Sequence, residues 1–451
     1  MSVFDFQDSR TTGGENQNKN MFAELFKFRP ERYERTLNQT TTPGTNAAIP
    51  IDLLSLFEKL PEAANKKAER KNESAPDNRG TRYDATSADI KAIFPELAHR
   101  ITGRAGEPIS LHDIGKALGD PKIRGRDAQV LVALKLSFDK IARLDSSNLE
   151  KPKNNRTLSA KSIDALDRLV SQRRSNQLQD KDALGLLESL DDAMVRTSDS
   201  VKSTVRTLYR DQAKPLESLV PDAVQQAGIG NCYFYGALAA LAAANPDEIR
   251  KMIRENQDGS YKVKFPGQKE IDVAAPSDAE ITLYPKAGQF GSWVWVMEKA
   301  YGQYCMKDPS ALAFRRLLGR DDSPVPQEHT EGPSFLDGGL RILTGKPINH
   351  VWNARPDDLH AQLSELMLEK PRRPITADAS VNVKTGEGAP VWMHTYSILD
   401  YNGKEKSVIM RNPWGFAPPA DSGVKDLGGG RFSMSLDLFA KYFSRISFPE
   451  K

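Results

Sequence analysis

Residues 226–235 read QAGIGNCYFY, and residues 236–244 continue as GALAALAAA before an Asn-Pro pair. The alanine-rich run predicts a helix that begins at Cys232 and ends near Asn245. At a helix N-terminus, the macrodipole and the free backbone N–H groups of the first turn favour a thiolate over a thiol. The glycines before the cysteine let a substrate approach the backbone closely. The stretch predicts a nucleophilic Cys232; the alternative is a buried cysteine that packs in a core helix.

A histidine and an asparagine lie far downstream, on two expected strands. Residues 391–400 (VWMHTYSILD) and 407–411 (SVIMR) read as strands joined by a turn that contains Asn-Gly. His394 and Asn412 are 18 residues apart, and this hairpin would bring them side by side. An asparagine carbonyl that accepts the imidazole N–H holds histidine in the tautomer that can take a thiol proton. Trp414 is expected to shield that bond from water.

Both blocks resemble the catalytic motifs of calpain-type cysteine proteases, a family with a papain-like fold. Residues 226–234 are similar to the family's Gln-Gly-x-x-Gly-Asp-Cys-Trp-Phe and differ at Ala227, Asn231 and Tyr233. The change from Asp to Asn at position 231 removes a charge beside the nucleophile. Residues 411–415 (RNPWG) match the family's second block without a change.

Two further stretches agree with this resemblance, which covers the chain from about residue 216 to its end. Residues 293–301 (WVWVMEKAY) resemble the family's helix that ends in Glu-Lys-Ala-Tyr, and residues 331–339 (EGPSFLDGG) resemble its Gly-rich stretch. From the residues alone, the first stretch predicts an apolar helix with a solvent-exposed end. The second predicts a Gly-rich loop that could line a substrate cleft.

The resemblance implies an α+β fold with a papain-like core, in which a helical subdomain carries Cys232 and a β subdomain carries His394 and Asn412. It implies limited proteolysis of protein substrates through an acyl-enzyme on Cys232. His394 would act as general base and then as general acid, and Asn412 would orient its ring. The Gln226 side chain and the Cys232 backbone N–H would form the oxyanion hole, with each donor contributing roughly 10²-fold or more in rate.

The same resemblance suggests which residues meet the substrate and whether a metal is needed. The expected substrate-binding residues are Gly230, Gly338, Gly339 and Trp414. The sequence requires no cofactor. Calpain-type cores bind calcium, but Asp378 and Asp400 in the second subdomain have no ligand spacing, so metal ligands stay unassigned and calcium dependence stays open.

Composition excludes several classes of protein. The chain has 451 residues, of which 39% are hydrophobic and 27% charged. A net charge of +3 gives no electrostatic case for binding nucleic acid. No apolar run is long enough for a membrane span, and the first nine residues lack the apolar core of a Sec signal peptide. Two cysteines, Cys232 and Cys305, exclude a disulfide framework and favour a reducing compartment, so a cytoplasmic location is expected.

Four regions are expected along the chain. Residues 1–80 are poor in hydrophobic residues and predict disorder. Such a flexible N-terminus also suits secretion into a host cell without a Sec signal. Residues 81–215 predict a helical domain, residues 216–345 a catalytic subdomain with the cysteine, and residues 346–451 a catalytic subdomain with the histidine and asparagine.

Residues 81–215 resemble a pair of degenerate EF-hands. Residues 109–114 look like the exit from one loop, and residues 138–145 and 158–163 look like the entry to and exit from another. A calcium loop needs alternating oxygen ligands, a glycine at position six and a bidentate glutamate at position twelve. The loop of residues 145–156 is too long, carries three basic residues and has Ser162 where the glutamate should be. The pattern favours a domain that binds a protein partner within residues 82–212 over a calcium sensor.

Three other functions remain as alternatives. A catalytically silent, calpain-like interaction protein would use the helical domain alone. A Cys-His acyltransferase or transglutaminase would carry Asp as the third catalytic residue, whereas Asn412 is followed by Pro-Trp-Gly. A calcium-sensing protein would need a better loop than that of residues 145–156.

Overall fold

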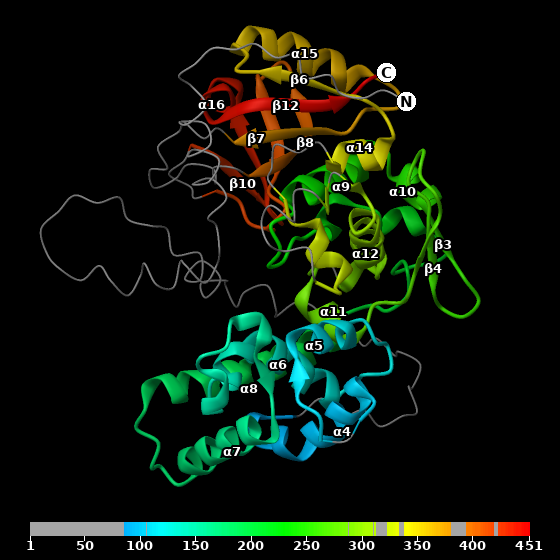
Figure 1. Cartoon of the computed structure of the whole chain (residues 1–451). Helices are drawn as coiled ribbons and strands as arrows, with labels where there is room; N and C mark the ends of the chain where they lie inside the picture. Colours follow the sequence, from blue (N-terminus) through cyan, green and yellow to red (C-terminus); the bar gives the residue numbers. More distant parts are fainter. Residues whose placement is uncertain are drawn as a thin grey trace, which may run out of the picture. The chain divides into compact units, whose positions relative to one another are not determined.

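The computed structural model describes residues 85–104, 106–286, 288–309, 311–312, 323–332, 338–379, 394–418 and 423–451. The predictions for residues 1–80, 333–337 and 391–393 lie outside these residues. The unit Thr81–Lys451 is compact and combines helices with sheets, so the predicted α+β class is confirmed (Figure 1). Among the helices that the structure describes, none has the length and apolar character that crossing a membrane requires.

Residues 85–202 form two helix–loop–helix units and a long final helix. Their elements are α4 (Ile90–Thr102), β1 (Ile109–Ser110), α5 (Leu111–Leu118), α6 (Arg126–Ala142), β2 (Thr157–Leu158), α7 (Ala160–Arg174) and α8 (Lys181–Lys202). The two-residue strands β1 and β2 pair antiparallel, with Ile109 opposite Leu158, and so join the two loops. Helix α8 packs along α6.

Matching serines start the second helix of each unit. The Ser110 hydroxyl accepts a hydrogen bond of 3.1 Å from the Asp113 N–H, and the Ser159 hydroxyl accepts one of 3.3 Å from the Ser162 N–H. Both residues form capping boxes, which satisfy backbone donors that the first helical turn leaves free. The sequence therefore sets where α5 and α7 begin, directly after the paired strands.

The region around Cys232 consists of helices and a small sheet. Its elements are α9 (Cys232–Ala244), α10 (Pro246–Met252), β3 (Ile253–Glu255), β4 (Tyr261–Val263), β5 (Ile271–Val273), α11 (Asp278–Leu283), α12 (Trp293–Cys305) and α14 (Gly338–Thr344). Helix α9 has the predicted bounds and is buried from Cys232 to Ala242. The three strands pair in the order β3-β4-β5.

Helix α12 differs from its prediction at its charged residues. The predicted solvent-exposed end is wrong, because Glu298 and Lys299 are only 2% and 5% exposed. Lys299 Nζ lies 2.8 Å from the carboxylate of Glu280 on α11, and Glu298 accepts a hydrogen bond from Asn231. Polar partners from other segments make burial of these two charged residue types tolerable.

The C-terminal region is a seven-stranded antiparallel sheet with two helices. Its elements are β6 (Ile348–Trp352), α15 (Pro356–Leu368), β7 (Ile375–Ala379), β8 (Thr395–Asn402), β9 (Ser407–Arg411), β10 (Lys425–Gly428), β11 (Arg431–Ser435), α16 (Leu436–Tyr442) and β12 (Phe443–Pro449). The strands follow the order β10-β11-β9-β8-β7-β12-β6. The sheet thus places β8 at its centre, between β9 and β7.

Strand β8 presents its two faces to different parts of the chain. The Ser397 hydroxyl donates a hydrogen bond of 2.7 Å to the Gly236 carbonyl in α9, and Thr395 also lies against Gly236. Tyr396 and Ile398, the alternate residues, belong to the apolar core that α15 and α16 cover. Because successive side chains of a strand point to opposite faces, β8 is the surface on which the helix of Cys232 rests.

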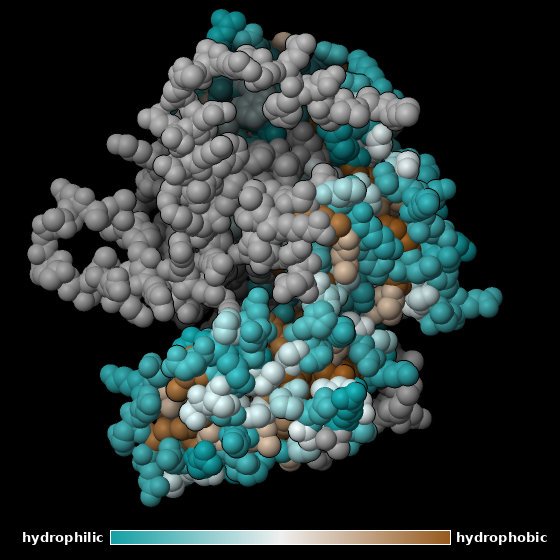
Figure 2. Space-filling view, viewed as in Figure 1, coloured by the Kyte–Doolittle hydropathy of each residue, from teal (hydrophilic) through white to brown (hydrophobic). Residues whose placement is uncertain are grey.

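Two hydrophobic cores stabilise the described residues. One runs from Ala85 to Leu343, so the helical region and the region around α9 share buried apolar side chains. The other, from Leu359 to Phe448, fills the space between the seven-stranded sheet and its two helices. Figure 2 shows that the described surface on this side is mostly hydrophilic, with scattered apolar residues.

Candidate active site

Cys232 is the first residue of α9, as predicted, and its thiol is buried. The side chain is 6% exposed. Thr395, at the start of β8, hydrogen-bonds the sulfur through its backbone N–H. The cysteine therefore lies against the residue that directly follows His394 in the chain.

The environment of Cys232 favours the thiol over the thiolate. Burial raises the pKa of Cys232 to about 11, and the negative charge of Asp378 acts in the same direction. Hydrogen bonds from Thr395 and the Tyr233 backbone N–H oppose this rise. The expectation that the helix N-terminus makes Cys232 a thiolate is therefore wrong for this buried site, because the loss of solvation outweighs the helix terminus.

His394 and Asn412 meet as predicted. His394 directly precedes β8 and Asn412 directly follows β9, and these strands pair antiparallel. His394 Nε2 lies 2.9 Å from Asn412 Oδ1. That oxygen also accepts a hydrogen bond of 3.0 Å from the Trp414 N–H, so it acts as an acceptor toward both groups. The imidazole proton is therefore on Nε2, which leaves Nδ1 with a free lone pair that can accept a proton.

The surroundings of His394 keep the ring neutral. The residue is 3% exposed, and burial lowers the pKa of His394 to about 4, although the bond to Asn412 acts in the opposite direction. The Trp414 ring lies over the imidazole, with ring centroids 4.2 Å apart. This is the position expected of a residue that keeps water from the His394–Asn412 bond.

An extended segment holds Gln226 against Pro413, the residue that follows Asn412. The Gln226 N–H donates a hydrogen bond of 2.8 Å to the Pro413 carbonyl, and Gln225 Nε2 donates one of 3.1 Å to the Trp414 carbonyl. Arg411 Nη1 anchors the same segment with a bond of 2.5 Å to the Val224 carbonyl. The Gln226 side-chain amide donates to the Ile229 carbonyl at 2.6 Å, so one of its two protons is already used within the cysteine loop.

The three predicted substrate-binding glycines lie in two places. Gly230 accepts a backbone hydrogen bond of 3.0 Å from Gly332, which brings the described start of the Gly-rich stretch beside the cysteine loop. Gly338 and Gly339 begin α14 and pack against other helices. A Cβ atom on Gly339 would lie 2.4 Å from the Tyr233 carbonyl, and one on Gly338 would lie 2.7 Å from the Tyr301 hydroxyl. Close packing thus accounts for these two glycines, and their role in substrate binding stays a prediction.

Sequence reasoning missed a chain of buried polar side chains next to Cys232. The Thr395 hydroxyl donates a hydrogen bond of 2.6 Å to Asp378 Oδ1, and Asp378 forms an ion pair with Arg445 at 2.5 Å. The three residues come from β8, β7 and β12. Asp378 is therefore already bound to a cation, whereas Asp400 is exposed and lies 3.6 Å from Arg372. The only sequence signal for Thr395 was its position next to His394.

The loop of residues 145–156 does not fit a calcium ion. Arg156, which is 7% exposed, donates to the Asn148 carbonyl at 3.2 Å and binds Asp139. Lys151 Nζ lies 3.2 Å from Asn148 Oδ1. Two protein cations therefore bind oxygen atoms of this loop, and the described residues contain no group of three or more His, Cys, Asp or Glu side chains arranged to hold a metal.

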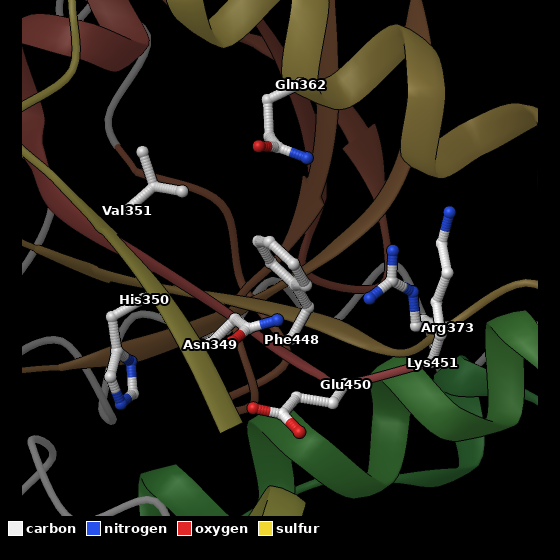
Figure 3. Close-up of a pocket in the computed structure, with 8 residues that line it drawn as sticks. All are labelled: Asn349, His350, Val351, Gln362, Arg373, Phe448, Glu450 and Lys451. Carbon is white, nitrogen blue, oxygen red and sulfur yellow. The ribbon is translucent and has the colours of Figure 1, made fainter. Parts of the chain in front are cut away.

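Three hollows on the surface of the described residues are lined by residues other than Cys232, His394 and Asn412. One, of about 480 Å³, lies between β6, α15 and the end of β12. Figure 3 shows Asn349 on one side of the Phe448 ring and Arg373 and Lys451 on the other. Arg373 lies over that ring and also binds Glu369 at 2.6 Å, so its charge is already neutralised.

No known protein-family model matches the chain.

Proposed function

We propose that the protein is a calpain-like cysteine endopeptidase with Cys232 as nucleophile, His394 as general base and acid, and Asn412 as the residue that orients His394. The observation that carries the proposal is the hydrogen bond of 2.9 Å between His394 Nε2 and Asn412 Oδ1. Thr395, the residue after His394, hydrogen-bonds the Cys232 sulfur through its backbone N–H. A thiol, an oriented imidazole and an orienting amide are the parts that thiol acyl transfer needs.

The reaction begins with two neutral groups. His394 Nδ1 accepts the Cys232 proton as the sulfur attacks the scissile carbonyl carbon, which gives a tetrahedral intermediate and an imidazolium. The imidazolium then gives its proton to the leaving amine as the C–N bond breaks, and an acyl-enzyme remains. Water attacks the acyl-enzyme as His394 takes one of its two protons. The C–S bond then breaks, His394 returns that proton to the sulfur, and the product leaves as a carboxylic acid that loses its proton to solvent.

The negative charge of each tetrahedral intermediate needs donors. The Cys232 backbone N–H and the second proton of the Gln226 side-chain amide are the proposed pair. Both groups belong to one short loop, since Gln226 bonds the Ile229 carbonyl three residues before Cys232. Removing one such donor typically lowers kcat by roughly 10²–10³-fold.

The proposed architecture is a papain-like core. Helix α9 rests on strand β8, so a helical subdomain with the nucleophile meets a β subdomain with the base. We further propose that residues 85–174 are a degenerate EF-hand pair, supported by two helix–loop–helix units whose loops are joined through β1 and β2. Its role would be to bind a protein partner rather than calcium, because Arg156 and Lys151 bind the oxygen atoms of the second loop.

The substrates of such an enzyme would be extended segments of proteins. Calcium dependence of the catalytic core stays open, and no step above requires the ion. The proposed location is the cytoplasm, or a host cell after secretion without a Sec signal.

The experiment that tests the proposal is cleavage of casein by the wild type, by Cys232→Ala and by Cys305→Ala, each with calcium and with chelator. Cys305 is a matched control, since it is the other cysteine and is equally buried. We expect cleavage by the wild type and Cys305→Ala but not by Cys232→Ala. Cleavage by Cys232→Ala would overturn the assignment of the nucleophile. Absence of cleavage by any variant would favour a silent interaction protein or an acyltransferase.

A further inference from the structure

The residue before the nucleophile is held by its side chain from two sides. Asn231 Nδ2 donates a hydrogen bond of 2.8 Å to Glu298 Oε1 on α12 and one of 2.7 Å to the Thr330 hydroxyl. Asn231 is 0% exposed and Glu298 is 2% exposed. Both protons of the Asn231 amide are therefore used in a buried site, with acceptors 67 and 99 residues away in the chain.

The backbone of the same residue starts α9. The Asn231 carbonyl accepts hydrogen bonds from the N–H groups of Phe234 (2.9 Å) and Tyr235 (3.2 Å). The peptide bond between Asn231 and Cys232 carries the N–H that we propose as an oxyanion donor. The orientation of Asn231 therefore sets the direction of that donor and the position of the Cys232 side chain.

Two buried oxygen atoms of this pair lack a donor. Asn231 Oδ1 and Glu298 Oε2 have no partner within hydrogen-bond distance among the described residues. The Tyr235 hydroxyl group lies near the Glu298 carboxyl group but is not within that distance either. Unsatisfied buried oxygen atoms are costly. Asn231 and Glu298 already share one hydrogen bond, so a single proton on Glu298 Oε2 would give the pair a second one, to Asn231 Oδ1. The carboxylic acid of Glu298 and the amide of Asn231 are then joined by two hydrogen bonds.

We propose that Glu298 is a positioning residue for the nucleophile: its protonated carboxyl group pairs with the Asn231 side chain and so holds the first turn of α9 and the Cys232 backbone N–H in place. Glu298 acts through Asn231 and does not itself touch the substrate. This inference rests on the proposed function, because it explains what fixes the positions of the Cys232 side chain and backbone N–H for attack on a substrate.

The charges that face Glu298 favour the protonated form. Burial and, to a smaller extent, the negative charge of Glu280 on α11 raise the pKa of Glu298 to about 8, while hydrogen bonding from Asn231 and Tyr235 opposes the rise. Tyr284 is the other titratable group whose charge interacts with Glu298. Lys299, the neighbouring cation on α12, is bound to Glu280 at 2.8 Å.

The pairing also gives a physical reason for asparagine at position 231. The Thr330 hydroxyl donates its own proton to the Gln327 carbonyl at 2.7 Å, so it offers Asn231 a lone pair. An ionised aspartate at position 231 would face this lone pair and the Glu298 carboxyl group without a donor for either. An amide supplies both donors and carries no charge into the buried site.

The test compares Glu298→Gln and Glu298→Leu with the wild type, and uses Glu248→Gln as a control on the exposed surface of α10. The uncharged amide of a glutamine can form the same two hydrogen bonds with Asn231, whereas leucine can form neither of them. We expect Glu298→Leu to lower kcat by about 100-fold with little change in KM, as for a misplaced reacting group. Glu298→Gln should restore most of that loss, and Glu248→Gln should behave as the wild type.

The pH profile gives a readout that a purely structural role would not move. The wild type should lose activity as pH rises through about 8, where Glu298 ionises, and Glu298→Gln should lack this limb. An identical alkaline limb in Glu298→Gln would overturn the proposal. Equal kcat in Glu298→Leu and the wild type would also overturn it.

Two measurements need no activity and therefore separate this inference from the proposed function. The folded pKa of Glu298 lies above its ordinary 4.5, so the wild type should lose thermal stability relative to Glu298→Gln as pH rises from about 4.5 to about 8. The infrared carbonyl band of a protonated carboxylic acid should persist in that window and vanish in Glu298→Gln. If neither the stability difference nor the infrared difference is seen, the Asn231–Glu298 pairing is contradicted, even in an active enzyme. If both are seen in a protein without activity, the pairing stands and only the proposed function is contradicted.

Discussion

Asp378 and Arg445 form a buried ion pair close to Cys232, with Arg445 Nη2 2.5 Å from Asp378 Oδ2. The other carboxylate oxygen accepts the Thr395 hydroxyl proton, and the Thr395 backbone N–H bonds the Cys232 sulfur. The pair thus connects β12 and β7 to the residue of β8 that contacts Cys232. A charge that is neutralised and hydrogen-bonded in this way can remain in a protein interior.

Breaking this pair should destabilise the protein strongly. Arg445→Met leaves the Asp378 charge buried without its cation, and we expect the free energy of unfolding in urea to fall by about 3–5 kcal/mol. Arg250→Met, which removes an exposed arginine from its bond to Asp247, is the control and should change stability little. Equal effects of the two substitutions would show that Asp378 does not depend on Arg445.

Thr395 should tune the reactivity of the nucleophile. Its hydroxyl group donates its proton to Asp378, and so offsets part of the negative charge that raises the pKa of Cys232. Thr395→Val should therefore raise that pKa further and slow alkylation of Cys232 at a given pH. The measurement is the pH dependence of the alkylation rate in a Cys305→Ala background. Ser397→Ala is the control, since Ser397 faces α9 on the same strand but bonds the Gly236 carbonyl; a shift as large in Ser397→Ala would contradict a specific role for Thr395.

Burial of neutral His394 predicts a loss of stability on the acid side. Its pKa in the folded protein is about 4, below the ordinary 6.5, so the unfolded chain takes up a proton first as pH falls. Stability from this residue is present above pH 6.5 and is lost as pH falls toward about 4, by up to about 3 kcal/mol. Urea unfolding at several pH values should show a smaller acid loss in His394→Gln than in the wild type. Parallel curves for the two proteins would refute this account.

Arg156 should stabilise the helical region in the place where an EF-hand would hold calcium. Arg156→Met leaves the Asn148 carbonyl and Asp139 without this donor, and we expect a loss of about 1–3 kcal/mol in thermal unfolding. Arg143→Met removes the other arginine that binds Asp139, but Arg143 is 52% exposed, so a change within about 0.5 kcal/mol is expected. Calorimetric titration should show no calcium binding at this loop, and saturable binding lost in Asp145→Asn would contradict that expectation.

The sequence predicted those parts of the site that local patterns determine. An alanine-rich run after Cys232 predicts the start of α9, and a hairpin pattern predicts that His394 and Asn412 meet, because both depend on neighbouring residues. The Asp378–Arg445 pair depends on β12 lying next to β7, a long-range strand order that no local pattern reveals. The bond between Asn231 and Glu298 joins two segments through tertiary packing, so α12 was wrongly expected to have a solvent-exposed end.

The packing of Gly338 and Gly339 shows the same limit. A Gly-Gly pair in a sequence is compatible with a loop that lines a cleft, and also with a helix that begins in close contact with another helix. A Cβ atom added at Gly339 would lie 2.4 Å from the Tyr233 carbonyl oxygen, which explains that glycine through its contact with α9. Sequence spacing alone could not separate the two interpretations.

The central claim is that Cys232 reacts as a nucleophile because His394 and Asn412 activate it. The most direct measurement is the rate at which a peptidyl epoxide labels the protein, followed by mass spectrometry of the labelled peptide, in the wild type, His394→Ala, Asn412→Ala and Cys305→Ala. We predict one label, on Cys232, at a rate that falls by about 100-fold or more in His394→Ala, less in Asn412→Ala, and remains unchanged in Cys305→Ala. Labelling of Cys232 at the same rate with and without His394, or labelling of Cys305 instead, would contradict the account.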